Sequence, residues 1–250
     1  MVETRIFGQK IFSCVASEAL VKIEELISTK DISLITGLNV LYVTECDKDK
    51  DLSDFYNNCE LVTVDGRPLV YLSRFFASYR FPEMVGGPNL WGKLLHYGAE
   101  KNLTFYFLGA TDEILEKAEE TLTRDVKELK IIGKHNGFFD IKGKEMDVIV
   151  EELRVLKPDI IYLGLPTPYK EEIAIILKER LDKACIVLIG GMFDVFAGEK
   201  KVGNKVVSYL MLDWILRIAQ EPRRLFWRYM KSNAYFAYMI MREILRRKKL

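Results

Sequence analysis

Residues 185–194 read CIVLIGGMFD, an apolar run followed by two glycines and the start of a segment with helical character. Residues 61–66, LVTVDG, have the same form, with an aspartate and one glycine after the run. Neither run alternates apolar with polar residues, as a strand does when one of its faces meets water. Each stretch therefore predicts a strand that is buried on both faces and ends in a turn. Together they indicate a parallel sheet between layers of helices.

The same succession of apolar runs and helical patterns extends along most of the chain. Short strands are expected at 32–36, 61–64, 104–108, 130–132, 160–163 and 186–189. Amphipathic helices are expected at 17–28, 89–101, 112–125, 144–156 and 169–181. This order predicts an α/β fold, a mostly parallel sheet covered by helices on both faces in Rossmann-like layers. Five aromatic residues are expected in its core: Phe75, Phe76, Tyr79, Tyr106 and Phe107.

Several predicted strands end in glycine or turn residues just before a helix. In open α/β sheets that edge binds ligands, and free helix N-terminal amides there suit phosphates. Asp65 would bring to this edge a carboxylate that can accept a proton, although an aspartate–glycine pair is also an ordinary turn. Gly190 and Gly191 would let backbone amides approach a nucleotide closely. Asp194 either caps the helix that follows or touches that nucleotide.

The C-terminal part of the chain differs in charge from the rest. The formal net charge is +1, but residues 217–250 carry ten basic and two acidic side chains, so this segment is +8 and the remainder −7. After Glu221 and Pro222 the pattern changes to one long aromatic and basic helix. We therefore predict an α/β domain at 1–219 and a helical appendage at 220–250 that meets an anionic partner.

A helical projection gathers the cations of the appendage on one side. The stripe holds Arg224, Arg228, Lys231, Tyr235, Tyr238, Arg242, Arg246 and Lys249. Beside it lie Phe226, Trp227, Met230, Phe236, Met239, Ile240 and Met241. This mixture is typical of helices that lie on anionic membranes. The alternative is an amphipathic helix packed on its own domain with solvated cations, whereas a nucleic-acid partner does not suit the acidic body.

Cysteine usage and hydropathy indicate a compartment. The four cysteines are scattered and form no CxxC pair, which favours buried free thiols in a reducing cytosol: Cys14, Cys46, Cys59 and Cys185. The N-terminus lacks a signal-peptide pattern, and the longest uncharged stretch of the appendage, 232–241, has ten residues, against about 20 for a spanning helix. We expect a cytoplasmic protein that crosses no bilayer and is bound peripherally to a membrane. That this membrane is the plasma membrane, contacted at its inner face, is what a family resemblance of residues 64–66, 189–194 and 221–224 implies.

Three phrases carry a resemblance to a known family: VDG at 64–66, IGGMFD at 189–194 and EPRR at 221–224. In this order and spacing they resemble the WecG/TagA/CpsF glycosyltransferases, glycosyltransferase family 26, over residues 5–242 and most specifically over 190–228. The resemblance implies inverting transfer of a hexose or N-acetylhexosamine, such as ManNAc, from a UDP-sugar to a polyprenyl-diphosphate-linked sugar. Members act in teichoic acid and cell-surface polysaccharide synthesis.

The resemblance also implies roles for single residues. A matching aspartate in the family is proposed as the general base, so Asp65 would deprotonate the acceptor hydroxyl. Asn39 and Thr36 are assigned to the same catalytic group. The remaining site residues are Gly190, Gly191, Asp194, Lys170 and Glu171 for the donor, and Arg217, Arg223, Arg224 and Arg228 for the diphosphates and the membrane.

Three polar positions of the family pattern are changed in this chain. Gly37 replaces a usual threonine, Met84 a usual arginine and Lys170 a usual glutamine, which leaves the exact sugar open. Lys170 either supplies the positive charge that Met84 lacks or is a solvated lysine on a helix face. The alternative function is a catalytically weak or inactive, membrane-associated sugar-nucleotide-binding protein. An oxidoreductase would need an NAD fingerprint, and the resemblance leaves a homo-oligomer open.

No metal or organic cofactor is expected. His96 and His135 are isolated, and the chain has neither a nucleoside-triphosphate loop nor a dinucleotide fingerprint. Many glycosyltransferases of other folds bind a metal through an Asp-x-Asp pair, and Asp47, Asp49 and Asp51 contain that string. Because it alternates with lysines, we predict a solvated loop there. Helix N-termini and arginines would then stabilise the leaving diphosphate.

Overall fold

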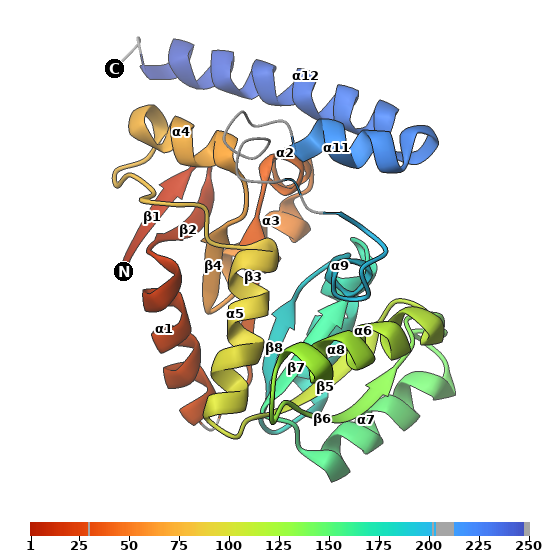
Figure 1. The fold of residues 1–250 in the computed structure, drawn as a ribbon. Coiled ribbons are helices and arrows are strands. Elements are labelled where there is room, and N and C mark those ends of the chain that lie inside the picture. The colour runs from red at the N-terminus through yellow and green to blue at the C-terminus, as the bar shows by residue number, and fades with distance from the viewer. Residues whose placement is uncertain (30, 202, 204–212, 248–250) are drawn as a thin grey trace.

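The computed structural model describes residues 1–29, 31–201, 203 and 213–247. Its centre is a six-stranded sheet in the order β4-β3-β8-β7-β5-β6, in which every pairing is parallel (Figure 1). The strands are β3 (Ser33–Leu38), β4 (Leu61–Val64), β5 (Thr104–Gly109), β6 (Lys130–His135), β7 (Ile160–Gly164) and β8 (Cys185–Leu188). All six predicted strands are therefore confirmed, within a few residues at their ends.

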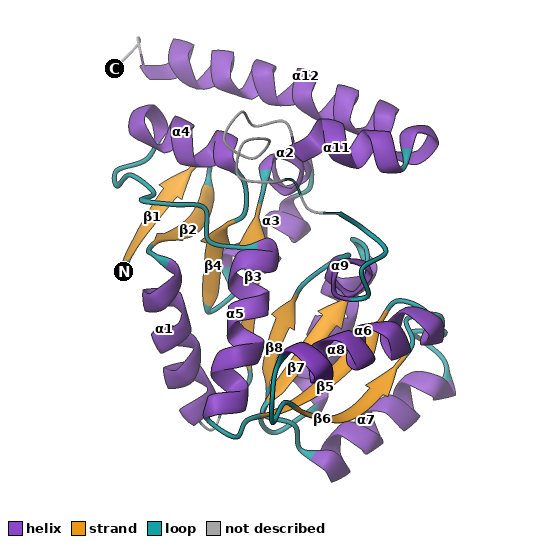
Figure 2. Ribbon diagram, in the orientation of Figure 1, coloured by secondary structure: helices purple, strands orange, loops and turns teal. Residues whose placement is uncertain are grey.

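Helices cover both faces of this sheet (Figure 2). One face packs on α1 (Ala16–Ser28), α5 (Gly87–Glu100), α6 (Asp112–Asp125) and α9 (Met192–Phe196). The other packs on α2 (Val40–Lys48), α3 (Lys50–Asn57), α4 (Arg67–Phe76), α7 (Lys144–Leu156) and α8 (Tyr169–Arg180). The α/β architecture with Rossmann-like layers is confirmed.

Strands β3, β4, β5, β7 and β8 do not alternate in polarity because both of their faces are buried, whereas the edge strand β6 is only partly buried. In β5, Phe105 and Phe107 pack on the α1 and α5 side, whereas Tyr106 and Leu108 pack on the α7 and α8 side. All four side chains are 0% exposed. Burying one large aromatic side chain contributes on the order of 2 kcal/mol, so the two cores together hold the layers on the sheet.

A hairpin at the N-terminus was missed by the sequence analysis. Strands β1 (Val2–Ile6) and β2 (Gln9–Ser13) pair antiparallel through a turn at Phe7 and Gly8, which both have positive φ. In β1 only Thr4 and Ile6 are buried. A five-residue strand with a single buried apolar side chain gives too weak a pattern to be distinguished from a loop.

The predicted solvated loop at Asp47, Asp49 and Asp51 is wrong. The segment contains the end of α2 and the start of α3, and Asp49 caps α3 by accepting a hydrogen bond from the Leu52 amide at 3.1 Å. Asp47 accepts hydrogen bonds from Tyr235 and Arg242 of the C-terminal helix. The carboxylates therefore join helices together, which the alternation with lysines concealed.

The C-terminal segment forms one helix, α12 (Pro222–Arg247), preceded by α11 (Asp213–Gln220). Four side chains of α12 are buried against the domain: Leu225, Ser232, Phe236 and Met239. Ser232 lies 3.0 Å from the Thr44 hydroxyl of α2, and Phe236 packs edge-on against Phe7. The helix thus does pack on its own domain, with α2 and α4 beneath it (Figure 1).

The outward face of α12 is apolar. Phe226, Trp227, Met230, Met241 and Leu245 are between 44% and 68% exposed, on the side of the helix opposite the buried one. Within the described residues, no helix combines the length and the hydropathy that crossing a bilayer requires.

Two of the aromatic residues expected in the core are in fact exposed. Phe76, Tyr106 and Phe107 are buried as predicted, but Phe75 is 68% and Tyr79 53% exposed. Phe75 lies at the end of α4, one residue from the buried Phe76, so its side chain points away from the core. All four cysteines are buried and free, as expected.

Candidate functional site

Asp65 follows β4 at the carboxyl edge of the sheet. Its amide donates to the Leu38 carbonyl at the end of the neighbouring strand β3, at 2.8 Å. The Val85 amide donates to the Val64 carbonyl, also at 2.8 Å, and thereby attaches the segment before α5 to the same edge. The Asp65 side chain is half-buried. The structure thus places this carboxylate where ligands bind in such sheets.

Glycines surround the Asp65 side chain. A Cβ added at Gly86 would lie 2.6 Å from the Asp65 Cβ and 2.7 Å from its Cγ, and one at Gly37 would lie 2.9 Å from the Cβ. Gly86 is also the residue that precedes α5, so the carboxylate sits at the amide end of a helix, which favours negative charge. Gly37, noted as a departure from the family pattern, thus leaves room for the aspartate.

Arg67 is a residue that the sequence analysis missed. It begins α4 two positions after Asp65, and its Nε is buried without a hydrogen-bond partner in the described structure. A cation at a helix N-terminus is unfavourable because the helix dipole is positive there. The position therefore suits a guanidinium that meets an anionic ligand. The signal in the sequence is an arginine directly after the aspartate–glycine pair.

Asn39 lies next to the turn that carries Asp65 and caps α2, whose first turn contains Tyr42. The Asn39 side chain caps α2 by accepting a hydrogen bond from the Tyr42 amide at 3.2 Å. A Cβ at Gly66 would lie 3.5 Å from the Asn39 Cβ, so Asn39 packs against the turn that carries Asp65. Capping thus fixes Asn39 at the edge of the site and orients Tyr42 toward the next strand.

The Gly190 turn approaches the same helix from β8. Gly190 has φ +58, and a Cβ there would lie 3.9 Å from the Tyr42 hydroxyl. This left-handed conformation favours glycine. Tyr42 therefore connects the strand end that carries Asn39 with the Gly190 turn. Tyr42 was also missed, because a tyrosine in an amphipathic segment gives no signal of its own.

A buried polar cluster adjoins Tyr42 on its other side. The Lys170 Nζ lies 3.9 Å from the centre of the Tyr42 ring and 3.3 Å from Glu171 Oε1. The same oxygen accepts hydrogen bonds from the hydroxyls of Tyr56 at 2.5 Å and Thr167 at 2.9 Å. Glu171 Oε2 is buried and has no partner in the described structure. One carboxylate oxygen thus meets every donor, and the other meets none.

Lys170 is not the solvated lysine that the sequence left open, because it is 2% exposed. Burial would lower the pKa of its ammonium group, but Tyr42 and Glu171 outweigh that effect and raise this pKa above its ordinary value. Burial and the Glu171 carboxylate raise the pKa of the Tyr56 hydroxyl well above its usual range. Lys170 therefore stays charged and Tyr56 stays protonated at neutral pH.

Asp194 connects the Gly190 turn to the C-terminal helices. It does not cap α9, whose preceding residue is Gly191, and instead forms an ion pair with Lys200 at 3.2 Å. Lys200 also pairs with Glu221 at 2.9 Å. Two segments of the most specific part of the family pattern are thus joined through one lysine, at the junction of α11 and α12.

The other predicted site residues are not joined to this group. Thr36 is 1% exposed within β3, and its Oγ1 is buried without a partner in the described structure. Arg223 and Arg228 are exposed on α12. The side chains of Arg217 and Arg224 lie outside the described residues, as does Lys249.

The carboxyl ends of four adjacent strands, β4, β3, β8 and β7, therefore bring together a carboxylate, a glycine turn and a buried ion pair. The carboxylate can accept a proton, and the exposed amides of the turn can bind phosphate or a nucleotide. Among the described residues, no three His, Cys, Asp or Glu side chains form a group that could hold a metal ion.

Comparison with known proteins identifies the family. Residues 4–250 match the model of the Glycosyl transferase WecG/TagA/CpsF family. A relative from Bacillus subtilis (strain 168), named N-acetylglucosaminyldiphosphoundecaprenol N-acetyl-beta-D-mannosaminyltransferase, is 24% identical over 78% of this chain and 74% of its own. A protein of the same name from Staphylococcus aureus (strain MW2) is 25% identical over 85% and 81%. The chain belongs to the WecG/TagA/CpsF family of glycosyltransferases.

Proposed function

We propose that this protein transfers an N-acetylhexosamine from a UDP-sugar to a sugar linked to polyprenyl diphosphate, with inversion at the anomeric carbon. The observation that carries the proposal is that Asp65 and the Gly190 turn lie on the two sides of the first turn of α2. A base and a nucleotide-binding turn are the two elements such a transfer needs. The names of both relatives make N-acetylmannosamine the first donor sugar to test.

Asp65 acts as the general base in this proposal. In a single displacement, the acceptor oxygen attacks the anomeric carbon as its proton passes to the carboxylate, and the bond to UDP breaks on the opposite side. The glycines at 37 and 86 let two backbone segments pack closely on Asp65 and so fix the position of its carboxylate. Arg67 faces the charge of the leaving diphosphate, since its Nε has no partner in the described structure.

The Lys170–Glu171 cluster supports the donor. The unpartnered Glu171 Oε2 is an acceptor for a hydroxyl or N–H group of the nucleotide sugar, which would remove the cost of leaving that oxygen unsatisfied. Tyr42 presents its hydroxyl to the Gly190 turn and is held by Lys170. Lys170 thus orients a neighbouring side chain in this proposal and does not pair with the diphosphate itself, because Glu171 already engages it.

The appendage brings the site to the lipid-linked acceptor. The exposed apolar face of α12 and the cations beside it suit the interface of an anionic membrane. Arg223 and Arg228 lie near the start of the helix, where Lys200 holds Glu221 beside Asp194. These arginines would close over the diphosphates while the outer face of the helix contacts the membrane.

Replacing Asp65 by Asn tests the proposal. Transfer of N-acetylmannosamine from its UDP derivative to a lipid-linked N-acetylglucosamine acceptor should fall by about two to four orders of magnitude, because the amide cannot accept the proton. UDP affinity, measured by calorimetry, should change less than about threefold. The product formed by the wild-type enzyme should have the anomeric configuration opposite to that of the donor.

The control is Asp182→Asn, an exposed aspartate between α8 and β8 at the opposite edge of the sheet, which should leave transfer unchanged. Equal transfer by the Asp65→Asn variant and the wild type would refute the role of Asp65. A product that retains the donor configuration would exclude the single displacement. Wild-type protein that binds the nucleotide sugar but transfers it to no acceptor would support the alternative function, a binding protein.

A further inference from the structure

A cationic groove lies where the end of α12 crosses the N-terminal hairpin. Its larger part has a volume of about 430 Å³ and lies between the Phe7–Gly8 turn, the end of α4 and the last turns of α12. A smaller part of about 300 Å³ continues toward Asp47 and Arg242. The two parts share Phe7, Gly8, Glu243 and Arg246. The groove is distinct from the Asp65 site. The two lie at opposite ends of α4, which begins at Arg67 near Asp65 and ends at Phe76 in the groove.

Some of the charged side chains in this groove are already engaged. Arg247 donates to the carbonyls of Phe75 and Phe76 at the end of α4 and pairs with Glu243 at 3.1 Å. It therefore satisfies the last carbonyls of that helix and neutralises the carboxylate that lines the larger part of the groove. Arg242 is paired with Asp47. Neither arginine has its charge available for a ligand.

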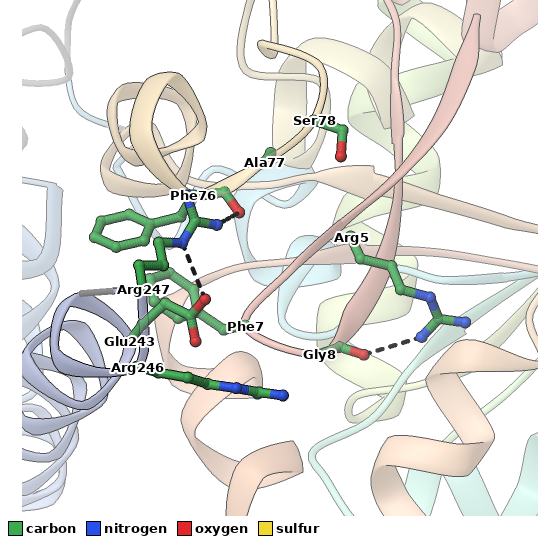
Figure 3. Close-up of a pocket in the computed structure, with 9 residues that line it drawn as sticks. All are labelled: Arg5, Phe7, Gly8, Phe76, Ala77, Ser78, Glu243, Arg246 and Arg247. Carbon is green, nitrogen blue, oxygen red and sulfur yellow. Dashed lines mark hydrogen bonds and ion pairs between the residues drawn. The ribbon is translucent and has the colours of Figure 1, made fainter. Parts of the chain in front are cut away.

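Arg5 and Arg246 are different. Arg5 donates one hydrogen bond, to the Gly8 carbonyl at 3.1 Å, and Arg246 forms no hydrogen bond or ion pair with the described residues. A guanidinium has five N–H donors, so most of theirs remain unused. Figure 3 shows Arg246 extending beneath the Phe7–Gly8 turn, toward the side on which Arg5 lies. The Ser78 hydroxyl lines the same space.

Two guanidinium groups and a hydroxyl are the chemistry that recognises a phosphate. Arginine binds phosphate oxygens through two parallel N–H donors, more specifically than lysine does. A phosphate between Arg5 and Arg246 would meet donors from both sides. The groove is also large enough for the glycerol or sugar that such a phosphate carries.

The surroundings indicate the source of the phosphate. Phe75 and Tyr79, which adjoin the lining residues Phe76 and Ser78, are 68% and 53% exposed. Exposed aromatic side chains next to cations are typical of proteins at the membrane–water interface. A free phosphate ion would gain nothing from exposed aromatic side chains nearby, whereas the acyl chains next to a lipid head group would pack against them.

We propose that the groove between Arg5 and Arg246 binds the phosphate of an anionic phospholipid head group. The inference rests on the membrane contact proposed for α12, and it adds a specific lipid site at the opposite end of that helix from Arg223. The hairpin, α4 and α12 would then contact the membrane together. A bound lipid would also hold the end of α4, whose first turn carries Arg67 beside Asp65.

Vesicle binding by the full chain tests this site. Vesicles of phosphatidylglycerol and phosphatidylcholine are compared with vesicles of phosphatidylcholine alone, using the wild type and Arg5→Gln/Arg246→Gln. The double variant should bind the anionic vesicles about thirtyfold more weakly, which corresponds to the loss of two cations at the surface. Its binding to neutral vesicles, which depends on the apolar face of α12, should change less than twofold.

The charge-matched control is Arg124→Gln/Lys130→Gln, which removes two exposed cations from α6 and β6. It should weaken binding to anionic vesicles less than threefold, and an equal loss in both double variants would refute a specific site. Inorganic phosphate at millimolar concentration should compete with the vesicles for the wild type but not for Arg5→Gln/Arg246→Gln. If phosphate binds to Arg5 and Arg246 while vesicle binding is unaffected by their loss, the lipid source is refuted.

Transfer to a soluble acceptor analogue separates this inference from the proposed function. The Arg5→Gln/Arg246→Gln variant should retain that activity within about twofold, because neither residue touches the proposed substrates. The wild type could lack transfer activity and still bind anionic vesicles about thirtyfold more tightly than Arg5→Gln/Arg246→Gln. That result would refute the enzyme and support the lipid site. Circular dichroism of both double variants checks that they are folded.

Discussion

The two acidic centres at the carboxyl edge of the sheet are built in opposite ways. Asp65 is half-buried, and the backbone at Gly37 and Gly86 approaches its side chain closely. Glu171 is 4% exposed and surrounded by the side chains of Lys170, Tyr56 and Thr167. Backbone atoms pack closely on the first carboxylate, whereas an ion pair and two hydroxyl groups fix the second. The contrast teaches that the two acidic residues are held differently: the path of the backbone positions Asp65, and side-chain partners position Glu171.

The largest effect on folding is expected from breaking the buried Lys170–Glu171 ion pair. Lys170→Met leaves the Glu171 carboxylate buried without its cation, so the free energy of unfolding should fall by about 3–5 kcal/mol. Urea denaturation of the two proteins measures this difference. The double change Lys170→Met/Glu171→Leu should recover part of the loss, because no unpaired charge then remains buried.

The matched control for that pair is Lys178→Met in the same helix. Lys178 forms an exposed ion pair with Glu60 at 2.9 Å, and exposed pairs contribute roughly 0–1 kcal/mol. If Lys170→Met were no more destabilising than Lys178→Met, the buried Lys170–Glu171 pair would contribute no more than an ordinary surface pair. The contrast drawn between Glu171 and Asp65 would then be wrong.

An intermediate effect, on activity and not on stability, is expected from displacing the Asp65 carboxylate. Gly86→Ala places a methyl group 2.6 Å from the Asp65 Cβ, so the carboxylate must move. A displacement near 1 Å costs up to about a hundredfold in rate, and kcat should fall by roughly ten- to a hundredfold while UDP affinity stays within about threefold. Steady-state kinetics and calorimetry measure the two quantities.

Gly92→Ala is the internal control for this substitution. Gly92 lies in the same helix, and a Cβ there would meet no atom within 4 Å. It should leave kcat unchanged and stabilise the protein slightly, since alanine is the better helix former by about 1 kcal/mol. Equal losses of activity in both variants would indicate a general effect on α5 and not a displacement of Asp65.

The smallest effect is expected at Asp47, a third carboxylate that joins α2 to α12. Burial would raise the pKa of this group, but Arg242 and Tyr235 hold it below its ordinary value. Stability from a lowered pKa is present above the unfolded pKa of about 4 and is lost as the pH falls through the folded value. Asp47→Asn should therefore lower the free energy of unfolding by about 0.5–1 kcal/mol at pH 7. The difference from the wild type should shrink as the pH falls through the lowered pKa of folded Asp47, and a difference that stays constant through that titration would exclude the charge as its cause.

The layered fold could be predicted because its signal is strong and local. The run at 185–189 and four of its five counterparts contain no charged residue and do not alternate, as a strand buried on both faces requires, and the fifth, at 130–132, forms the partly exposed edge strand β6. The elements that were missed have weaker patterns. The hairpin at 2–13 buries few side chains, and the polar segment at 47–51 became helical because Asp49 caps α3 and Asp47 meets α12. The contacts of Asp47 join residues almost 200 positions apart, and no local pattern records them.

The site could be predicted only in part, for the same reason. Asp65, Asn39 and the Gly190 turn follow strands directly, so the topology alone brings them to one edge. The roles of Tyr42 and Arg67 depend on packing between elements, and the residue types alone do not reveal it. For Lys170 the residue type suggests a solvated surface, whereas the structure buries it beneath Tyr42.

The place of β8 has a consequence for how the protein is made. This strand is the last of the sheet to leave the ribosome, yet it lies between β3 and β7 and pairs with both. Until residues 185–188 emerge, the earlier strands can form only two separate half-sheets with unpaired edges, and such edges promote aggregation. The Gly190 turn follows β8 directly, so the sheet is completed and this turn reaches the carboxyl edge in the same step of biosynthesis. A nascent chain that stalls before this strand therefore keeps these unpaired edges exposed and is prone to aggregate.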